Sequence, residues 1–325
     1  MERLADKWTL ITLSTLAVSL VLLRFAKKPK KPTHLAVLKQ SNLENHVRSV
    51  KELKFSIVHY SDLVKLPPPI NFNYLKVINS SSKAVHKYAS NLLYSYSTTS
   101  TQTLLESYFP DTLQGVLYIS EVQTQGRGRT GDWESPEGCL MFSYKFTCEA
   151  KYAVILQCLI PLAILKSIQK SALEVGCSLE QLRDLKVKWP NDVYLGKEKI
   201  AGILVNSTSS GKYLVACIGV GINVENETPT VSLRNKLSQK LSRERVLINY
   251  LESFEELFEA ALENQETVLE DYKNNWKDYN KGVLLKPTET QGTLIDLNTD
   301  GQLVVVDAQG EKHLISDRES IEFLN

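Results

Sequence analysis

A glycine- and arginine-rich stretch at residues 123–143, QTQGRGRTGDWESPEGCLMFS, is the part of the sequence best suited to bind an anion. Gly126 and Gly128 let the backbone approach a ligand closely and adopt φ values closed to other residues. Arg127 and Arg129 alternate with them and add permanent charge and forked N–H donors, which suit a phosphate or an acyl phosphate. Taken alone, these four residues fit a solvated arginine loop equally well. The stretch is neither a Walker loop nor a dinucleotide-binding fingerprint.

Two further motifs place polar side chains beside apolar strands. In KWPNDVYLGKEKIAG, residues 188–202, Asn191 and Asp192 occupy a turn and Lys199 precedes the strand IAGILV. Ordinary turn chemistry would also explain the Asn-Asp pair, and a surface position would explain the lysine. In GVGIN the glycines permit close approach and Asn223 offers a donor and an acceptor, although a plain strand-ending turn is the alternative.

Composition and charge exclude several classes of protein. The chain has 325 residues, of which 43% are hydrophobic and 23% charged, so collagen, wholesale disorder and a polytopic membrane protein are excluded. The 38 basic and 37 acidic residues give a net charge of +1, so we expect no nucleic-acid partner. Five cysteines without a C-x-x-C pair or a suitably spaced histidine favour reduced thiols, a cytosolic catalytic body and no fixed metal site.

The pattern of apolar residues predicts the elements that must position these motifs. We expect a short strand at Tyr74–Ile78, then a helix capped by Ser80–Ser82 whose apolar periodicity runs to Leu93, and a loop over residues 96–103. Further strands are predicted at residues 115–122, 140–146, 186–189, 200–206 and 213–219.

Two long helices and a β-rich tail complete the predicted body. One helix should span residues 152–175 with a kink at Pro161, and an amphipathic helix should span residues 247–262 and continue toward Trp276. From Val283 onward, short alternating runs separated by turns predict a small antiparallel β-barrel.

The N-terminal segment Trp8–Phe25 is mostly apolar and is followed by the basic run RFAKKPKKP. At ~1.5 Å per residue, a helix of this length spans roughly 27 Å, close to the ~30 Å hydrocarbon core of a bilayer. We expect a single-pass anchor that leaves the basic flank and the rest of the chain in the cytoplasm. A cleaved targeting peptide, or a segment absent from the mature chain, is the alternative.

Taken together, in this order and spacing, the three motifs resemble the biotin–protein ligase (holocarboxylase synthetase) family. A weaker match, INSSSKAV, resembles the Ser-Thr-Asn helix start of that family. The resemblance covers about residues 55–325 and implies an α+β fold, with a mixed sheet packed on helices as in class II synthetases, followed by a small SH3-like barrel. The expected layout is an anchor at 1–32, a tether at 33–54, a catalytic domain at 55–280 and a barrel domain at 281–325.

The resemblance also implies a reaction in two steps. Biotin and ATP, with Mg2+, give biotinyl-5′-AMP and pyrophosphate; a lysine on the biotin carrier domain of an apo-carboxylase then attacks, and AMP leaves. The arginine-rich loop would close over biotin and its adenylate and hide the reactive anhydride from water.

Roles follow from the resemblance residue by residue. The implied catalytic residues are Arg127, Arg129, Asp192 and Lys199. The implied biotin contacts are Ser81, Ser82, Lys83, Gln123, Gly126, Arg127, Gly128, Arg129, Lys199 and Gly202. The implied nucleotide contacts are Lys188, Asn191 and Asn223.

Several departures from the family keep alternatives open. Ser82 and Lys83 stand where the family has threonine and asparagine, and the loop at Gly131-Asp132-Trp133 is one residue short and carries an extra negative charge. A binding protein that holds biotin or nucleotide without turnover would explain these changes, although the retained arginines, Asp192 and Lys199 oppose it. A lipoate–protein ligase is the other alternative, which the KWPND and GRGR motifs oppose. A helix-turn-helix domain is not expected, so DNA binding is not expected either.

Overall fold

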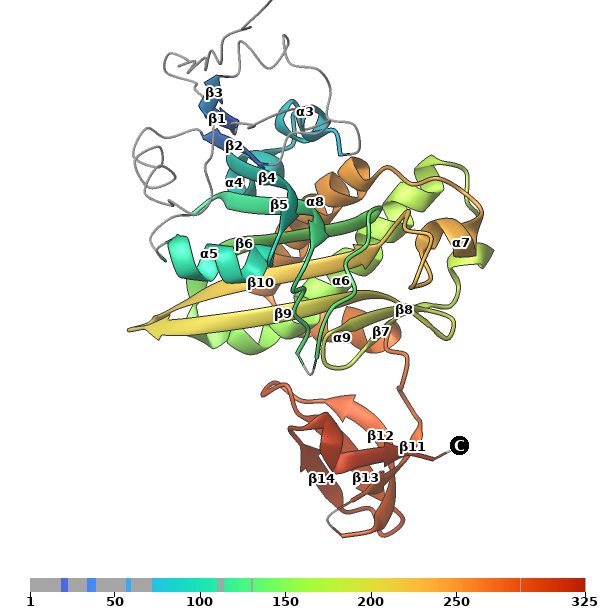
Figure 1. The fold of residues 1–325 in the computed structure, drawn as a ribbon. Helices are drawn as coiled ribbons and strands as arrows, with labels where there is room; N and C mark the ends of the chain where they lie inside the picture. Colours follow the sequence, from blue (N-terminus) through green and yellow to red (C-terminus); the bar gives the residue numbers. More distant parts are fainter. Residues whose placement is uncertain are drawn as a thin grey trace, which may run out of the picture.

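The computed structural model describes residues 72–324 apart from 110, 112, 113, 130 and 287. It also describes three short strands nearer the N-terminus: β1 (Ser19–Leu22), β2 (His34–Leu38) and β3 (Ile57–His59). Within these residues a large α+β body is followed by a small β domain at the C-terminus (Figure 1).

A ten-stranded mixed sheet forms the centre of the body, in the order β1-β3-β2-β4-β5-β6-β10-β9-β8-β7. The pairs β2–β3 and β4–β5 are parallel and the other neighbours are antiparallel. The remaining bounds are β4 (Asn91–Thr98), β5 (Val116–Gln123), β6 (Cys139–Glu149), β7 (Leu185–Lys188), β8 (Asp192–Leu195), β9 (Glu198–Ser210) and β10 (Tyr213–Asn223). The five strands predicted between residues 115 and 219 are therefore confirmed, and the pairing of β6, β10 and β9 builds the long central ribbons of Figure 1.

Helices cover the sheet unequally. Helices α6 (Ala153–Glu174), α8 (Arg243–Glu263) and α9 (Gln265–Asn274) pack together behind one face, here called the helix face, and α4 (Lys83–Tyr88) packs on α8. The opposite face, here called the α5 face, carries α5 (Thr101–Tyr108) over β6 and β10. Two shorter helices are α3 (Tyr74–Ile78) and α7 (Leu233–Leu237). Short 3-10 turns occupy Ala150–Tyr152, Glu180–Leu182 and Arg318–Ser320.

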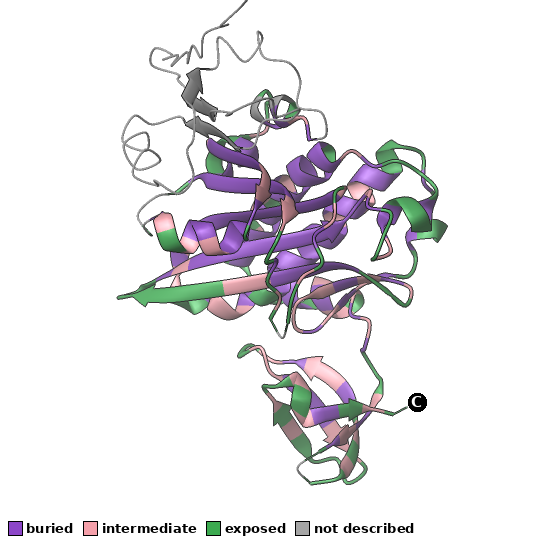
Figure 2. Cartoon of the chain, in the orientation of Figure 1, coloured by how far each residue is buried: buried purple, intermediate pink, exposed green. Residues whose placement is uncertain are grey.

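Aromatic side chains fill the layer between the sheet and the helices. Alternate residues of β6 point to the helix face, where Tyr144 and Phe146 meet Phe254 of α8 edge to face, with ring centroids 5.7 and 5.0 Å apart. All three rings are buried, as are most residues of the central strands (Figure 2). This packing explains why the alternating sequence of β6 and the amphipathic pattern of α8 are mutually consistent.

The apolar helix α6 belongs to this core. Together with the preceding turn, residues Ala150–Glu174 make the one helix among the described residues that is long and apolar enough to cross a membrane, and 72% of its most apolar window is buried. It runs as a single α-helix through Pro161. Its apolar character is therefore explained by the protein core.

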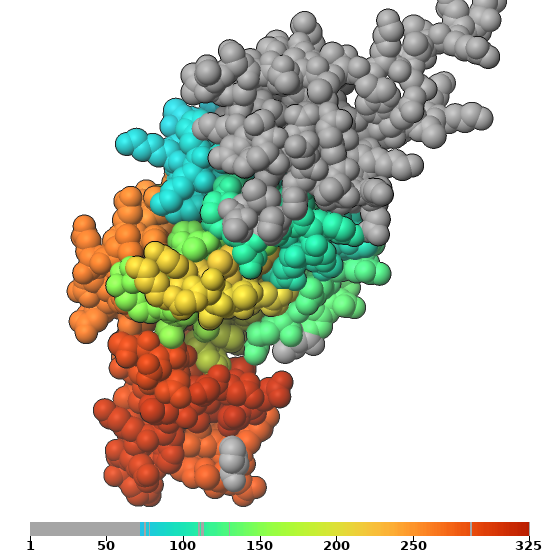
Figure 3. All heavy atoms as spheres, turned by 90° about the vertical axis from the view of Figure 1, so that its left-hand side faces the viewer, coloured from blue at the N-terminus to red at the C-terminus, as the bar shows by residue number. Residues whose placement is uncertain are grey.

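The C-terminal domain is a five-stranded antiparallel sheet, in the order β14-β13-β12-β11-β15. Its strands are β11 (Gly282–Leu285), β12 (Thr290–Leu297), β13 (Leu303–Asp307), β14 (Lys312–Ile315) and β15 (Ile321–Phe323). The predicted antiparallel strands are confirmed, whereas the pairings leave β14 and β15 as edges and do not close the sheet into a barrel. In the space-filling view this domain forms a separate lobe below the exposed tip of the β9–β10 hairpin (Figure 3).

Three predictions for the start of the body are wrong. The run Tyr74–Ile78 is a helix rather than a strand, because a run of five residues is too short for its period to separate the two. The helix capped by Ser82 ends at Tyr88, and Leu92 and Leu93 lie in β4, where they are buried. Residues 96–103 form the end of β4 and the start of α5 rather than a loop, since Ser100 accepts a capping hydrogen bond from the Thr103 amide at 3.5 Å.

Two other segments also differ from the predictions. The amphipathic helix ends at Glu263, and Asn264 caps a new helix, α9, by accepting a hydrogen bond from the Glu266 amide. Of the predicted anchor Trp8–Phe25, the structure describes Ser19–Leu22, which form strand β1 and pair with β2 and β3 instead of forming a helix. The rest of that anchor, and residues 23–33, lie outside the described residues.

Candidate active site

Glycines clear a slot on the α5 face of the sheet. Gly202 of β9 and Gly221 of β10 are cross-strand partners, and Gly202 also pairs with Asp192 of β8. A Cβ atom added to Gly202 or Gly221 would lie only 2.7 or 2.5 Å from the indole ring of Trp133. The register therefore brings Asp192, a glycine-lined slot and the Trp133 ring together.

Trp133 belongs to residues 124–135, here called the arginine loop. The loop folds back on itself: the Trp133 amide donates to the Gly126 carbonyl at 2.9 Å, and the Gly128 amide donates to the Gly131 carbonyl at 2.7 Å. A Cβ atom on Gly126 would lie 2.4 Å from the Trp133 carbonyl oxygen, so this approach needs glycine. The fold of the loop places Arg127 and Arg129 in the lining of a cavity.

Arg127 reaches from this loop to helix α5. Its Nη1 donates to the Thr103 hydroxyl at 3.3 Å and lies 3.6 Å from a carboxylate oxygen of Glu106. The Arg127 side chain is about half exposed (48%), so this ion pair is screened by solvent, and the guanidinium can turn toward a bound anion at low cost.

Lys199 and Asp192 form an ion pair at the other side of Trp133. The Lys199 Nζ lies 2.7 Å from the Asp192 carboxylate and 5.5 Å from the centroid of the Trp133 ring. Both side chains remain partly exposed, which leaves the ammonium able to meet a ligand as well as its partner. A cation and a carboxylate that contact each other directly therefore both line the cavity.

The start of α5 supplies the polar wall. The Thr101 amide and hydroxyl both donate to Gln123 Oε1, at 2.8 and 3.1 Å, and the Thr101 and Ser143 hydroxyls are 2.8 Å apart. Because Gln123 Oε1 is occupied in this way, its Nε2 faces Ser135 and Met141. Thr101, Gln123 and Ser143 are thus fixed by one another.

Gln102 presents an unused acceptor. Its Nε2 donates to the Cys217 carbonyl at 2.9 Å and to Glu106 Oε1 at 2.7 Å, so the amide orientation is set by two acceptors. The Gln102 side chain is 3% exposed, and its Oε1 has no hydrogen-bond partner among the described residues. A buried carbonyl oxygen left without a partner is costly, and a hydrogen-bond donor on a ligand in this cavity would satisfy it.

These groups line one cavity of about 190 Å3. Its described lining includes the cations Arg127, Arg129 and Lys199 and the carboxylates Asp132 and Asp192. Other polar members are Ser100, Thr101, Gln102, Gln123, Ser143 and Asn191. Such a cavity suits a small ligand that carries both negative charge and an N–H donor.

Comparison with known proteins agrees with this geometry. The model of the Biotin/lipoate A/B protein ligase family matches residues 94–223, which contain all of the described lining. Biotin–protein ligase 2 of Arabidopsis thaliana is 34% identical over 215 residues, a match that covers 63% of this chain and 64% of that protein. The chloroplastic biotin–protein ligase 1 of the same plant is 27% identical over 310 residues, or 90% of this chain and 84% of that one.

The chain is related in sequence to the biotin–protein ligases. The fold is shared with a biotin protein ligase from Aquifex aeolicus solved with biotin and ATP, at a TM-score of 0.55 and 24% identity. That match covers 72% of this chain and 98% of the Aquifex chain. The α+β fold predicted from the sequence, with a mixed sheet packed on helices, is therefore confirmed.

Most of the residues singled out from the family motifs meet at the cavity. The lining contains Gln123, Arg127, Gly128, Arg129, Asn191, Asp192, Lys199 and Gly202. Gly126 shapes the loop that carries the arginines, as described above. Lys188 is not among the lining residues; its Nζ lies 5.0 Å from the centroid of the Tyr194 ring.

The side chain of Asn223 makes hydrogen bonds within the protein, and Asn223 is not among the described residues that line the cavity. Burial raises the pKa of Cys139 to about 12, so this thiol stays protonated and donates to Asn223 Oδ1 at 3.3 Å. Asn223 Nδ2 donates to the Lys199 carbonyl at 3.4 Å. Asn223 therefore links the ends of β6 and β10 to the strand that carries Lys199.

Ser81, Ser82 and Lys83 are not brought to the cavity. They lie at the start of α4, which packs on α8, and the described lining contains none of them. The lining contains instead Ser100-Thr101-Gln102, at the start of α5. The signal that could have found them is a Ser-Thr pair placed before the apolar Leu104 and Leu105, a helix start of the same kind.

Trp133 and the glycines of β10 were also not identified as ligand-site residues from the sequence. Nothing in the spacing of Gly219 and Gly221 says which side chain will cover them. The cross-strand register, together with the return of the arginine loop, decides that Trp133 does so.

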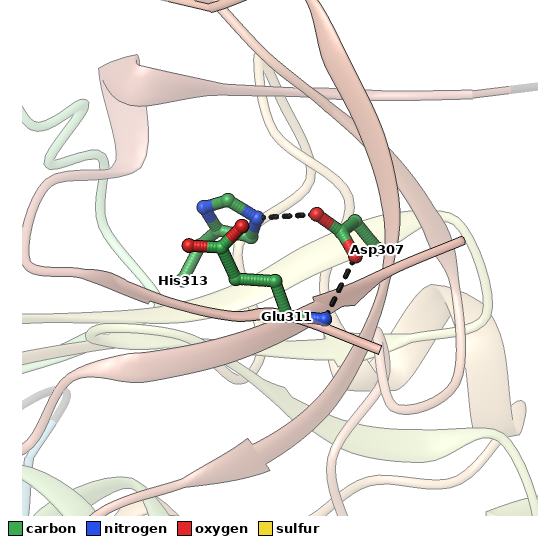
Figure 4. A group of neighbouring side chains, drawn as sticks. All are labelled: Asp307, Glu311 and His313. Carbon is green, nitrogen blue, oxygen red and sulfur yellow. Dashed lines mark hydrogen bonds and ion pairs between the residues drawn. The ribbon is translucent and has the colours of Figure 1, made fainter. Parts of the chain in front are cut away.

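One cluster of metal-ligand side chains occurs in the described residues, far along the chain from this cavity. Asp307, Glu311 and His313 place ligand atoms within 4.8 Å of one another at the β13–β14 turn (Figure 4). The Asp307 carboxylate accepts hydrogen bonds from the Gln309 and Glu311 amides at 3.0 and 2.8 Å and pairs with His313 at 2.8 Å. These bonds are those of a hairpin turn, which accounts for the cluster.

Proposed function

We propose that this chain is an ATP-dependent biotin–protein ligase that activates biotin and transfers it to a lysine of a carboxylase carrier domain. One observation carries the proposal: a single cavity combines the unpartnered acceptor of Gln102 with the cations Arg127, Arg129 and Lys199. Biotin offers both complements, because its ureido ring carries N–H donors and its valerate chain ends in a carboxylate. The sequence similarity to biotin–protein ligases supports the same assignment.

In the first step, an oxygen of the biotin carboxylate attacks the α-phosphorus of ATP and pyrophosphate leaves. Two anions must approach each other, so the site has to supply positive charge. Lys199 is proposed to meet the biotin carboxylate, while Arg127 and Arg129 face the phosphates. The Gln102 oxygen accepts a hydrogen bond from the ureido ring, and Thr101, Gln123 and Ser143 complete that end of the site.

In the second step, the amine of the acceptor lysine attacks the acyl carbon of biotinyl-5′-AMP and AMP leaves. The amine must be uncharged to attack, and Asp192 is the carboxylate placed to orient or deprotonate it. The proton that the amine loses is then held by Asp192, next to Lys199. Water must be kept from the adenylate meanwhile, which is the role proposed for the arginine loop and Trp133.

Magnesium enters this proposal with the nucleotide. Mg2+ in nucleotide sites is held mainly by phosphate oxygens and needs only one or two protein carboxylates. Asp132 and Asp192 lie in the described lining and can supply one, so the residues fit a metal carried by ATP. Asn191 is proposed to contact the nucleotide, whereas Asn223 acts by holding the strand of Lys199.

The layout and location of the protein are further parts of the proposal. Residues 55–280 are assigned to catalysis and residues 281–325 to the small domain. Attachment to a membrane through residues 8–25, with the catalytic domain in the cytoplasm, rests on the sequence alone, and strand β1 opposes a helix there. Carbonate extraction of cell membranes decides this point: an anchored chain stays in the pellet, and a chain without an anchor is released.

The deciding experiment is biotin transfer by the full chain. Purified protein is incubated with ATP, Mg2+, labelled biotin and an apo carrier domain, and the carrier is examined for label on its lysine. Label on the carrier supports the ligase. Tight biotin binding without transfer would replace it with a binding protein, and transfer of lipoate in preference to biotin would replace it with a lipoate ligase.

A further inference from the structure

Glu106 of α5 joins three elements around the cavity. One of its carboxylate oxygens accepts from Gln102 Nε2 at 2.7 Å and from Asn206 Nδ2 of β9 at 2.6 Å. The other lies 3.6 Å from the Arg127 guanidinium in the arginine loop. Glu106 is absent from the cavity lining, so it touches the site through these partners.

The contact with Gln102 decides which atom of that amide faces a ligand. Glu106 and the Cys217 carbonyl are both acceptors, so only the NH2 group of Gln102 can satisfy them. The Oε1 atom is the one left without a partner, 2.5 Å from where a Cβ on Gly219 would stand, and Gln102 and Gly219 both belong to the cavity lining. Without the carboxylate, one of the two acceptors that hold this orientation is lost.

The contact with Arg127 acts on the opposite wall. Arg127 is flanked by glycines that give the loop freedom, and its side chain is about half exposed. Glu106 and Thr103 are the groups on α5 that the guanidinium contacts. A side chain held at the rim loses less conformational freedom on binding than one that moves freely in water.

We infer that Glu106 is a positioning residue, one carboxylate that both presents the Gln102 acceptor and holds Arg127 at the rim of the cavity. The inference rests on the proposed function for its ligand, since the N–H donor and the anion are then the two ends of biotin. The geometry of Glu106, Gln102 and Arg127 stands without that function.

The test compares three Glu106 variants with Glu259→Gln, which removes the same charge from an exposed position on α8, outside the cavity lining. Glu106→Ala removes both contacts and should raise the KM for biotin about tenfold, the ratio that corresponds to ~1.4 kcal/mol. Its kcat should fall less, because Lys199 and Asp192 are untouched. Glu106→Gln keeps an acceptor for Gln102 but loses the charge, so it should show a smaller rise, and Glu106→Asp should recover part of the loss.

A second measurement does not depend on turnover. With 15N-labelled glutamine, the side-chain NH2 protons of Gln102 should exchange with water faster in Glu106→Ala than in the unaltered chain or in Glu259→Gln. Unchanged exchange, or a KM for biotin that stays the same or falls, overturns the inference. If the unaltered chain binds no biotin, the proposed function fails, while the exchange measurement still decides the role of Glu106.

Discussion

The two faces of the central sheet are built on opposite principles. On the helix face, Tyr144, Phe146 and Phe254 meet in edge-to-face contacts, and each ring touches several others. On the α5 face, glycine replaces side chains at Gly202 and Gly221, and a few polar contacts fix each group. The helix face stabilises the fold by burial, which many residues share, while the α5 face specifies a ligand through contacts that few residues can replace.

The largest effect on stability is expected from a substitution on the helix face. Phe254→Ala removes a ring that is fully buried between sheet and helices and should lower the free energy of unfolding by about 3–5 kcal/mol. Urea denaturation followed by circular dichroism measures this loss. Leu262→Ala, on the exposed side of the same helix, is the control and should change stability by less than about 0.5 kcal/mol.

The biotin affinity of the folded Phe254→Ala protein tests whether the two faces of the sheet are independent. Below its unfolding transition, the variant should bind biotin as the unaltered chain does, because the cavity lies across the sheet. A large loss of affinity in the folded state would mean that the two faces are not independent.

The next effect falls on the α5 face alone. Lys199→Ala removes a charge-assisted contact worth roughly 1.5–3 kcal/mol, so biotin adenylation should slow about ten- to a hundredfold. Stability should change by less than about 1 kcal/mol, because the Asp192–Lys199 pair is partly exposed. Pyrophosphate release measures the first step, and Lys197→Ala, an exposed neighbour, serves as the control. Normal adenylation by Lys199→Ala would remove the lysine from the proposed mechanism.

A smaller effect is expected when the slot beneath Trp133 is filled. In Gly221→Ala the added methyl would lie 2.5–2.8 Å from indole atoms, so the ring must shift at a cost of ~1–3 kcal/mol. Weaker biotin binding and an altered tryptophan fluorescence spectrum should appear together. Gly282→Ala adds the same methyl in the C-terminal domain, where the nearest atom lies 3.5 Å away, and should change neither property. Equal behaviour of the two variants would show that the slot has no role in binding.

The smallest effect concerns the C-terminal domain. The hydrogen bond with His313, together with the Glu311 and Gln309 amides, lowers the pKa of Asp307. A carboxylate with a lowered pKa in the folded state stabilises the fold above its ordinary pKa of about 3.9, and this contribution disappears as pH falls through the lowered value. The difference in melting temperature between the unaltered chain and Asp307→Asn should therefore shrink as pH falls from 6 toward 3. A difference that does not vary with pH would show that the turn gains nothing from the charge.

Long elements with a strong period could be predicted from the sequence. The α8 pattern and the alternation in β5, β6, β9 and β10 each draw on many residues, so the period survives local exceptions. The arginine loop and the KWPND segment could be located as well, because glycine, arginine and a turn pair at fixed spacing serve few purposes together. These motifs contain many of the residues that line the cavity.

The sequence by itself determined the class of fold, the family that the chain resembles and the residue types of the site. Only the tertiary structure decided that Ser100-Thr101-Gln102, rather than Ser81-Ser82-Lys83, forms the polar wall of the cavity. Both segments begin a helix, although Ser100 makes a side-chain capping hydrogen bond and Ser82 does not. What separates them is that α5 lies over β6 and β10, whereas α4 packs on α8. The placement of Trp133 over Gly221 and the hydrogen bonds of Glu106 to β9 have the same origin. Contacts between segments far apart in the chain depend on the register of strands, which local patterns of residue type do not encode.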